Sequence, residues 1–253
     1  LKLSRPFWRV KFDMNADLSV IDSVDLLFLV PDLMKHRQKI IYRPTDVYSY
    51  KSEHNIELEQ KFVKKNNIKV FCMSKHSYQF YLANDFNVVG YIENGINEEW
   101  IKNYKGYNSL DQLSLVYVGS LDDRIDYNTI QSIAADTDLS LTIYGSGPHV
   151  RKVNEIGKQL YKGTVAYGSL AHVLRSHNVG ILPLNDKLLN LSRSPMKLYE
   201  YLASGLYVLD KSQLQEFLLI SGVEEKKNYI KNNSMAQENV FNELNSRSWD
   251  NIV

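Results

Sequence analysis

The chain has little of several things that would place it in a common class of proteins. Its 253 residues include one cysteine, Cys72, which excludes a disulfide framework and a cysteine-based metal cluster. Its 30 lysine and arginine residues face 29 aspartate and glutamate residues, a net charge of +1. A dedicated DNA-binding protein normally has a clear basic excess. We therefore expect a protein of a reducing compartment that has no nucleic-acid partner.

Long apolar runs are also missing. The longest, Leu26–Val30, is followed by Pro31 and Asp32, whereas a transmembrane helix needs about 20 apolar residues. The first residues show no charged-then-apolar leader, and Leu1 in place of methionine predicts that an upstream portion precedes this sequence. We expect a cytoplasmic protein that makes peripheral contact with the inner surface of the membrane.

No arrangement of metal ligands stands out either. The six histidines have no HxxxH spacing or other ligand spacing. Asp136 and Asp138 have an Asp-x-Asp spacing that can hold a divalent metal. They precede an expected strand, however, at the end away from a ligand cleft, where a solvated loop is the better interpretation. We predict no metal site.

What the sequence does contain is a set of short apolar runs that alternate with helical stretches. An apolar fraction of 44% with 11% aromatics can build a core, and the alternation predicts a parallel α/β architecture. The expected strands are Val24–Val30, Lys39–Tyr42, Ile68–Met73, Val88–Ile92, Leu113–Val118, Leu139–Tyr144, Thr164–Tyr167, Val179–Pro183 and Tyr207–Leu209. The expected helices are His54–Lys65, Ser74–Asn84, Tyr127–Ala135, Arg151–Gln159, Leu170–Ser176, Pro195–Ala203 and Gln213–Ile220.

The polar stretch over residues 98–111 predicts a domain boundary. We expect two Rossmann-like parallel-sheet domains, a shortened one over residues 1–106 and a second over residues 107–253. Ligands of open parallel sheets bind beyond the carboxyl ends of the strands. Functional residues are therefore expected in the loops that follow the strands.

One helix has particularly clear boundaries. Ser194 is an expected N-cap, Pro195 occupies the first helical position, and Gly205 ends the helix before a strand. The start of such a helix favours a phosphate group. Lys197 lies in the first turn and Glu200 follows on nearly the same face, so a lysine for a diphosphate and a carboxylate for a ribose diol form a nucleotide clamp. An ordinary surface pair on a capped helix fits these two residues equally well.

Glycine-containing loops favour the nucleotide clamp over the surface pair. Gly119, Gly145 and Gly168 each follow an expected strand, and Pro183 ends a fourth strand. A glycine lets a ligand approach the backbone closely, and Arg124 lies where it would reach an anion. Each loop alone is a common turn, but their succession ahead of the capped helix indicates a nucleotide site.

These segments resemble the nucleotide-sugar-binding domain of the GT-B glycosyltransferases. The matching pieces are VYVGSLDDRIDY, LTIYGSGP, VAYGSLAHVLRSHNVGILPL and SPMKLYEYLASGLYVL. The last is particularly similar to bacterial exopolysaccharide glucuronosyltransferases of the xanthan type and to related GT4-like polysaccharide-assembly enzymes. The earlier segments KIIYRPTDVY, IKVFCMSKHSYQFY and VVGYIENGINEEW more loosely resemble the closing strands of the acceptor domain.

The resemblance implies roles for individual residues at the donor. It places the diphosphate at Lys197 and the Met196 backbone, the ribose at Glu200, further phosphate contacts at Gly119 and Arg124, and the base at Tyr167 and Gly168. Gly145 and Pro195 complete the implied donor site.

The resemblance also bears on stereochemistry. Many retaining members carry a glutamate where this chain has Ser192, so the comparison favours an inverting transfer. Such a transfer needs a base for the acceptor hydroxyl. Asp46, directly after an expected strand, is the candidate, and a turn or helix N-cap explains it equally well. Arg43 would steer an anionic acceptor or donor.

We thus expect a metal-independent glycosyltransferase without a cofactor, which moves a sugar from a UDP-linked donor to a polysaccharide or lipid-linked acceptor in capsule or exopolysaccharide synthesis. Two alternatives remain open. One is a GT-B-shaped sugar-nucleotide epimerase. The other is a non-catalytic partner that stabilises an active glycosyltransferase.

Overall fold

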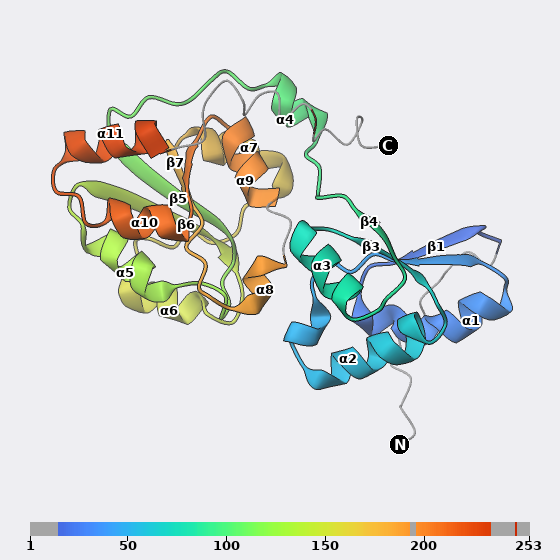
Figure 1. Cartoon of the computed structure of the whole chain (residues 1–253). Helices are drawn as coiled ribbons and strands as arrows, with labels where there is room; N and C mark the ends of the chain where they lie inside the picture. The colour runs from blue at the N-terminus through green and yellow to red at the C-terminus, as the bar shows by residue number, and fades with distance from the viewer. Residues whose placement is uncertain (1–14, 193–195, 234–245, 247–253) are drawn as a thin grey trace. The chain divides into compact units, whose positions relative to one another are not determined.

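The computed structural model describes residues 15–192, 196–233 and 246 (Figure 1). The chain divides into two compact units, Leu1–Ile92 and Glu93–Val253. Within the described residues each unit contains one four-stranded sheet in which all neighbouring strands are parallel. The predicted α/β class with two parallel-sheet domains is confirmed. No helix in these described ranges is long and apolar enough to cross a membrane.

The sheet of the first unit has its strands in chain order, β1-β2-β3-β4. The strands are β1 (Leu18–Ile21), β2 (Lys39–Tyr42), β3 (Lys69–Cys72) and β4 (Val88–Tyr91), and the helices between them include α1 (Val30–Lys35), α2 (Glu53–Glu59) and α3 (Lys75–Ala83). Right-handed crossovers that all run in one direction place their helices on one face of a sheet. Ile21 and Tyr42 are accordingly buried in the core, while Leu18 and Val20 on the other face are exposed.

A carboxyl group lies in the core of the first unit. Glu59 at the end of α2 is 1% exposed, and a π-helix over Gln60–Lys64 follows it. The hydroxyls of Tyr42 and Tyr81 both donate to Glu59 Oε1, at 2.7 and 2.6 Å. Burial raises the pKa of Glu59, and the two hydrogen bonds act in the opposite direction.

The predicted strand Val24–Val30 is wrong. Val24–Leu29 form a 3₁₀ helix that continues into α1, and the first strand is β1, which the sequence analysis did not predict. Val24, Leu27 and Val30 are buried, and their spacing of three residues matches one turn of a 3₁₀ helix. A short apolar run does not by itself distinguish a buried strand from a buried helix.

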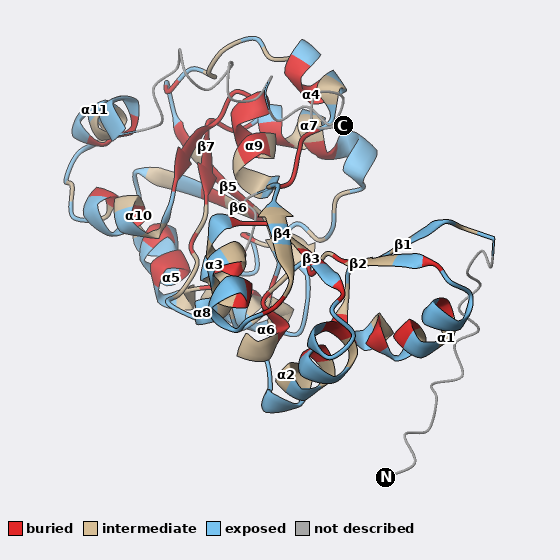
Figure 2. Cartoon of the chain, turned by 45° about the vertical axis from the view of Figure 1, so that its right-hand side comes forward, coloured by how far each residue is buried: buried red, intermediate tan, exposed pale blue. Residues whose placement is uncertain are grey.

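The second unit has strands β5 (Leu113–Ser120), β6 (Leu139–Ser146), β7 (Val179–Ile181) and β8 (Tyr207–Leu209). Its helices are α4 (Glu98–Lys102), α5 (Tyr127–Ala135), α6 (Val150–Ile156), α7 (Tyr167–Arg175), α8 (Leu188–Leu191), α9 (Met196–Ala203), α10 (Lys211–Phe217) and α11 (Val223–Asn233). The sheet order is β6-β5-β7-β8. Figure 2 shows the buried residues concentrated on these central strands and on the sides of the helices that face them.

The predicted strand Thr164–Tyr167 is also wrong. The contact with β6 lies earlier, at a bridge between Tyr161 and Ile143 and a hydrogen bond from the Gly145 N–H to the Gly163 carbonyl. The φ of Gly163 is 83°. Helix α7 begins at Tyr167.

The sequence analysis placed the domain boundary between residues 106 and 107, whereas residues 93–106 group with the second unit. The reason lies in α4, whose Trp100 and Ile101 are buried in one apolar cluster with Tyr199 and Leu202 of α9.

Candidate functional site

The strand order of the second sheet reverses at β5. Strand β6 pairs with β5 on one side, and β7 pairs with it on the other. In open α/β sheets ligands bind beyond the carboxyl ends of the strands at such a reversal. Here the reversal lies between β5 and β7, whose following loops are residues 121–126 and 182–187. We call these two segments the switch loops.

Lys197 lies against the end of β5. A Cβ atom added to Gly119 would overlap Lys197 Cε and would come within 2.7 Å of its Nζ. Only glycine therefore leaves room for the lysine side chain in this position. The predicted neighbours Gly119 and Lys197 are brought together, with the ammonium at the carboxyl end of β5.

Helix α9 is seated by a tyrosine that the sequence analysis did not single out. The fully buried Tyr201 accepts a hydrogen bond from the backbone N–H of Val118, at 2.8 Å. A Cβ at Gly180 of β7 would come within 2.7 Å of the Tyr201 ring. The Tyr201 ring thus contacts both β5 and β7 and fixes α9 against them. Lys197 lies one turn earlier in the same helix, so its position depends on this contact. Its only signal in the sequence is this spacing along one helix face.

Glu200 lies near Lys197 and Tyr167. Burial raises the pKa of the partly buried Glu200, and the charge of Lys197 acts to lower it. Burial and the charge of Glu200 together raise the pKa of Tyr167. Tyr167 is 58% exposed and its ring lies 5.9 Å from that of Trp100, centroid to centroid. A cation, a carboxylate and an exposed aromatic ring are thereby gathered on α7 and α9.

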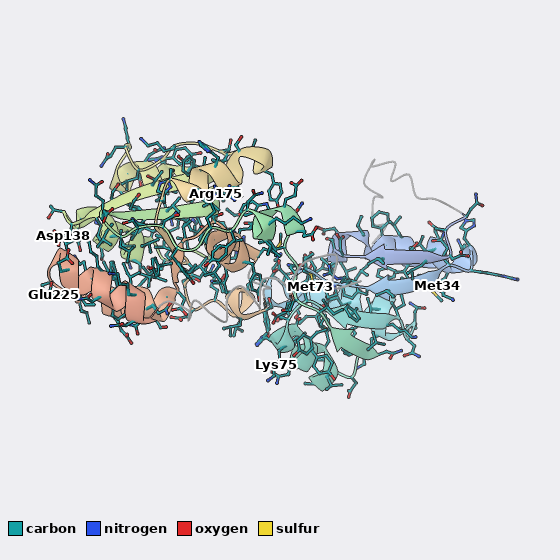
Figure 3. The ribbon with its side chains drawn as sticks, turned by 90° about the horizontal axis from the view of Figure 1, so that it is seen from above. Met34, Met73, Lys75, Asp138, Arg175 and Glu225 are labelled. Carbon is teal, nitrogen blue, oxygen red and sulfur yellow. The ribbon has the colours of Figure 1, made fainter. Side chains whose placement is uncertain are left out.

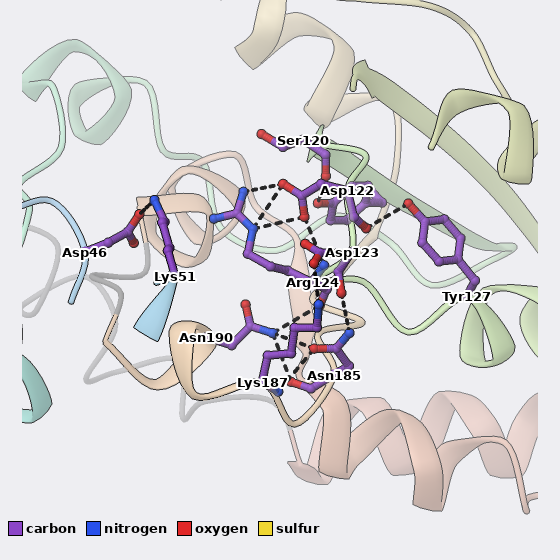
Figure 4. Close-up of polar contacts among 11 residues, drawn as sticks. Asp46, Lys51, Ser120, Asp122, Asp123, Arg124, Tyr127, Asn185, Lys187 and Asn190 are labelled. Atoms are coloured by element: carbon purple, nitrogen blue, oxygen red, sulfur yellow. Dashed lines mark hydrogen bonds and ion pairs between the residues drawn. The ribbon is translucent and has the colours of Figure 1, made fainter. Parts of the chain in front are cut away.

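Arg124 is held within its own switch loop. Its Nε donates to both carboxylate oxygens of Asp122, at 2.9 and 3.0 Å, and a terminal nitrogen donates at 2.5 Å (Figure 4). The Arg124 side chain is only 16% exposed. An anion that reached this guanidinium would therefore share it with Asp122.

The backbone conformation and a close neighbouring strand both require glycine at position 145. Its φ is 153°, and an added Cβ would overlap the carbonyl oxygen of Gly119 on the adjacent strand. Its N–H donates to Gly163 and its carbonyl accepts from the Tyr161 hydroxyl, at 2.8 and 2.9 Å. The close approach to Gly119 thus concerns β5, whereas the two hydrogen bonds hold residues 161–163 beside the end of β6.

Two predicted residues lie in the first unit. Asp46 follows β2, is 15% exposed and forms an ion pair with Lys51 at 2.9 Å between Oδ2 and Nζ. Ser52 caps α2, so Asp46 is not the helix cap that the sequence left open. The backbone N–H of Arg43 donates to the carbonyl of Ile21, at 2.7 Å.

Other predictions fall at the edge of the described residues. Ser194 and Pro195 lie outside them. Met196 is the first residue of α9 and its side chain is exposed. Gly168 occupies the first turn of α7, and an added Cβ there would meet nothing within 4 Å.

Asp136 and Asp138 hold a lysine. Both carboxylates form ion pairs with Lys226 of α11, at 2.5 and 3.3 Å, and Figure 3 shows Asp138 beside this helix, near Glu225. In the part of the chain that the structure describes, no three His, Cys, Asp or Glu side chains gather as metal ligands.

No protein-family model and no curated protein matches the sequence; the likeness is to solved structures. HepE from Anabaena, in complex with UDP-glucose, matches with a TM-score of 0.60 at 12% identity, over 85% of this chain and 68% of HepE. The lipopolysaccharide outer core galactosyltransferase WaaB matches with a TM-score of 0.61 at 11% identity, over 93% and 72%. A glycosyltransferase from Rickettsia africae matches with a TM-score of 0.53 at 13% identity, over 90% and 75%. With its two parallel-sheet units and these neighbours, the chain has the fold of the GT-B glycosyltransferases.

Proposed function

We propose that the chain is a glycosyltransferase that takes a sugar from a nucleoside-diphosphate donor, with UDP as the nucleotide, and passes it to a saccharide or lipid-linked acceptor in polysaccharide assembly. The observation that carries the proposal is the position of Lys197 over Gly119 at the carboxyl end of β5. The complex of HepE with UDP-glucose supports the choice of nucleotide.

In this proposal Lys197 and the first N–H groups of α9 bind the diphosphate. Negative charge develops on the diphosphate as the bond to the sugar breaks. A cation already positioned there stabilises the transition state more than the ground state. Arg124 adds a second positive charge from the switch loop, shared with Asp122. No metal is part of the proposed mechanism, because these groups supply the charge.

The nucleoside would lie along α7 and α9. The carboxylate of Glu200 accepts hydrogen bonds from the two ribose hydroxyls. Tyr167 offers an exposed ring face to the base, and Trp100 supports that ring.

For the acceptor we propose Asp46 as the base and Arg43 as a cation that steers an anionic substrate. We propose an inverting transfer, a choice that Ser192 favours because it stands where many retaining GT-B enzymes carry a glutamate. Ser192 is buried and its hydroxyl donates to the Leu189 carbonyl, at 3.0 Å.

The test combines binding with turnover. A ligand that binds the folded chain raises its melting temperature by mass action, so UDP is expected to raise it while ADP at the same concentration raises it less. Consumption of UDP-sugars is then measured with and without an oligosaccharide acceptor. A transferase consumes the donor fully only with the acceptor, whereas an epimerase releases free sugar without it. Absence of a UDP shift and of turnover with every UDP-sugar contradicts the proposal.

A further inference from the structure

Two asparagines join the switch loops. Asn185 Nδ2 donates to the carbonyl of Asp123 at 2.7 Å, and its backbone N–H donates to the carbonyl of Arg124 at 2.9 Å. Asn190 Nδ2 donates to the same Arg124 carbonyl at 3.0 Å and to the carbonyl of Asn185 at 2.9 Å. Figure 4 shows both amides directed at the backbone of the opposite loop. We call this pair the asparagine bridge.

The sheet itself does little to hold these loops together. Strands β5 and β7 pair only through Leu115–Val179 and Val116–Gly180, and β5 continues to Ser120. Beyond this pairing, the backbones of the two loops form an antiparallel bridge at Ile125 and Leu184, which includes the Asn185 N–H bond to Arg124 and a bond from the Asp126 N–H to the Pro183 carbonyl at 2.8 Å. The side chains add an ion pair between Asp123 and Lys187 and the amide contacts of Asn185 and Asn190. Two backbone hydrogen bonds and these side chains together therefore fix the geometry at the reversal of strand order.

The bridge acts on the segments that carry both cations of the proposed donor site. The Arg124 carbonyl accepts from Asn185 and Asn190 while its guanidinium is held by Asp122, so this residue is fixed at both ends. Asn190 lies in α8, at the start of the segment that leads to α9 and Lys197. A site whose charged groups are held in place before the ligand arrives binds it more tightly.

We infer that Asn185 and Asn190 are positioning residues for the donor diphosphate. They touch no donor atom and act by fixing the switch loop of Arg124 relative to the segment that carries Lys197. This inference rests on the proposed function, because it names the residues that preorganise the same site.

The chain offers a matched control at the other end of the same strands. The side chain of Asn178, just before β7, accepts from the backbone N–H of Ser114 at 3.0 Å and donates to the carbonyl of Ser109 at 2.9 Å. Asn178→Ala thus removes a comparable bridge between the β5 and β7 segments at their amino ends, away from the switch loops. Both variants are expected to lower the melting temperature.

The experiment compares UDP dissociation constants by calorimetry for the wild type, Asn190→Ala and Asn178→Ala. Asn190→Ala is expected to weaken UDP binding about tenfold, the effect of one or two lost hydrogen bonds, and to raise the donor KM while the acceptor KM stays unchanged. Asn178→Ala is expected to leave the UDP dissociation constant and the donor KM within about twofold of the wild type, because it removes no contact of the switch loops. Asn185→Ala, measured in the same way, replaces Asn190→Ala if that variant does not fold.

Equal UDP affinity in Asn190→Ala and the wild type overturns the inference, and so does an equal loss of affinity in Asn178→Ala, which would mark a general effect of stability. The proposed function fails separately, if the wild type itself binds no UDP. Amide hydrogen exchange over residues 121–126 in the ligand-free chain then still reports on the bridge. Faster exchange in Asn190→Ala than in Asn178→Ala is expected, and equal rates contradict the inference.

Discussion

The two units are both four-stranded parallel sheets, yet they differ in strand order. The first unit runs β1-β2-β3-β4 in chain order, whereas the second runs β6-β5-β7-β8. Chain order places successive crossovers on one face and leaves no reversal within the sheet. The second unit reverses between β5 and β7, and there the loops diverge to opposite faces. Both sheets have four strands, yet among the described residues only the sheet of the second unit contains the reversal at which a ligand binds.

The units also place their charged groups differently. The first buries Glu59 in its core beneath two tyrosine hydroxyls. The second places Lys197 and Arg124 at the carboxyl end of β5, with Glu200 near Lys197 on α9. The comparison teaches that a buried ionisable group by itself does not mark a binding site. Its position relative to the strand order has to be considered as well.

The largest effect is expected at Lys197. Lys197→Ala removes the cation from the donor diphosphate and is expected to lower turnover about 10²–10³-fold, the scale of losing one such electrostatic contact. The measurement is kcat for a UDP-sugar and its acceptor. Lys158→Ala, a change at an exposed lysine of the same unit, is the control and is expected to keep wild-type turnover. A kcat of Lys197→Ala near that of the wild type would contradict the proposed donor site in the second unit.

A second prediction separates a buried lysine of the second unit from its more exposed neighbour in α11. Lys226 is 3% exposed and holds Asp136 and Asp138 ahead of β6. Lys226→Ala leaves two carboxylates without their cation and is expected to lower the free energy of unfolding by about 3 kcal/mol. Its neighbour Lys227 pairs with the exposed Glu224, and Lys227→Ala is expected to cost at most about 1 kcal/mol. Urea denaturation measures both, and equal costs would contradict this difference.

A smaller effect is expected at Gly119. The added methyl of Gly119→Ala would overlap Lys197 Cε, so the lysine has to move and UDP binding is expected to weaken about tenfold. In a Lys197→Ala background the same change is expected to have little further effect, because its target is gone. Calorimetry on the four proteins of this double-mutant cycle checks the coupling. Strictly additive losses would show that Gly119 and Lys197 act independently.

The smallest effect is a pH dependence in the first unit. Burial raises the pKa of Glu59 above its ordinary 4.5. A carboxyl with a raised pKa contributes stability below its unfolded pKa and loses that contribution as the pH rises through the folded value. Relative to Glu59→Gln, the wild type is therefore expected to become less stable as the pH rises from about 4.5. Denaturation at several pH values measures this, with Glu57→Gln on the exposed side of α2 as the control. A pH-independent difference would contradict the buried-carboxyl interpretation.

Local patterns in the sequence predicted much of this architecture. Helix α5 runs from Tyr127 to Ala135 as predicted, because Asp126 caps it and apolar residues recur at helical spacing. The longer predicted strands of the second unit correspond to β5 and β6. Val24–Val30 failed because a buried 3₁₀ helix and a buried strand share the same apolar composition. Thr164–Tyr167 failed because the contact with β6 ends at Gly163, whose φ is 83°, and helix α7 begins at Tyr167.

For the candidate site, the sequence supplied residue types whose chemistry suits a nucleotide, among them Lys197, Glu200 and Gly119. It did not single out Tyr201, Asn185 or Asn190, because these residues form no recognisable motif beyond the helical spacing of Tyr201 from Lys197. Their contacts reach Val118, Asp123 and Arg124, which are more than 60 positions away in the chain. Such partners become neighbours only when the strands assemble.

The amino-acid sequence alone determined the alternation of strands and helices, because propensity, capping and apolar periodicity act over a few residues. Tertiary structure alone decided that β7 lies beside β5 and that the Lys197 stem crosses Gly119. It also decided that Glu59 is buried beneath two hydroxyls. These outcomes depend on pairing and packing between distant segments, and no local stretch of the chain contains that information.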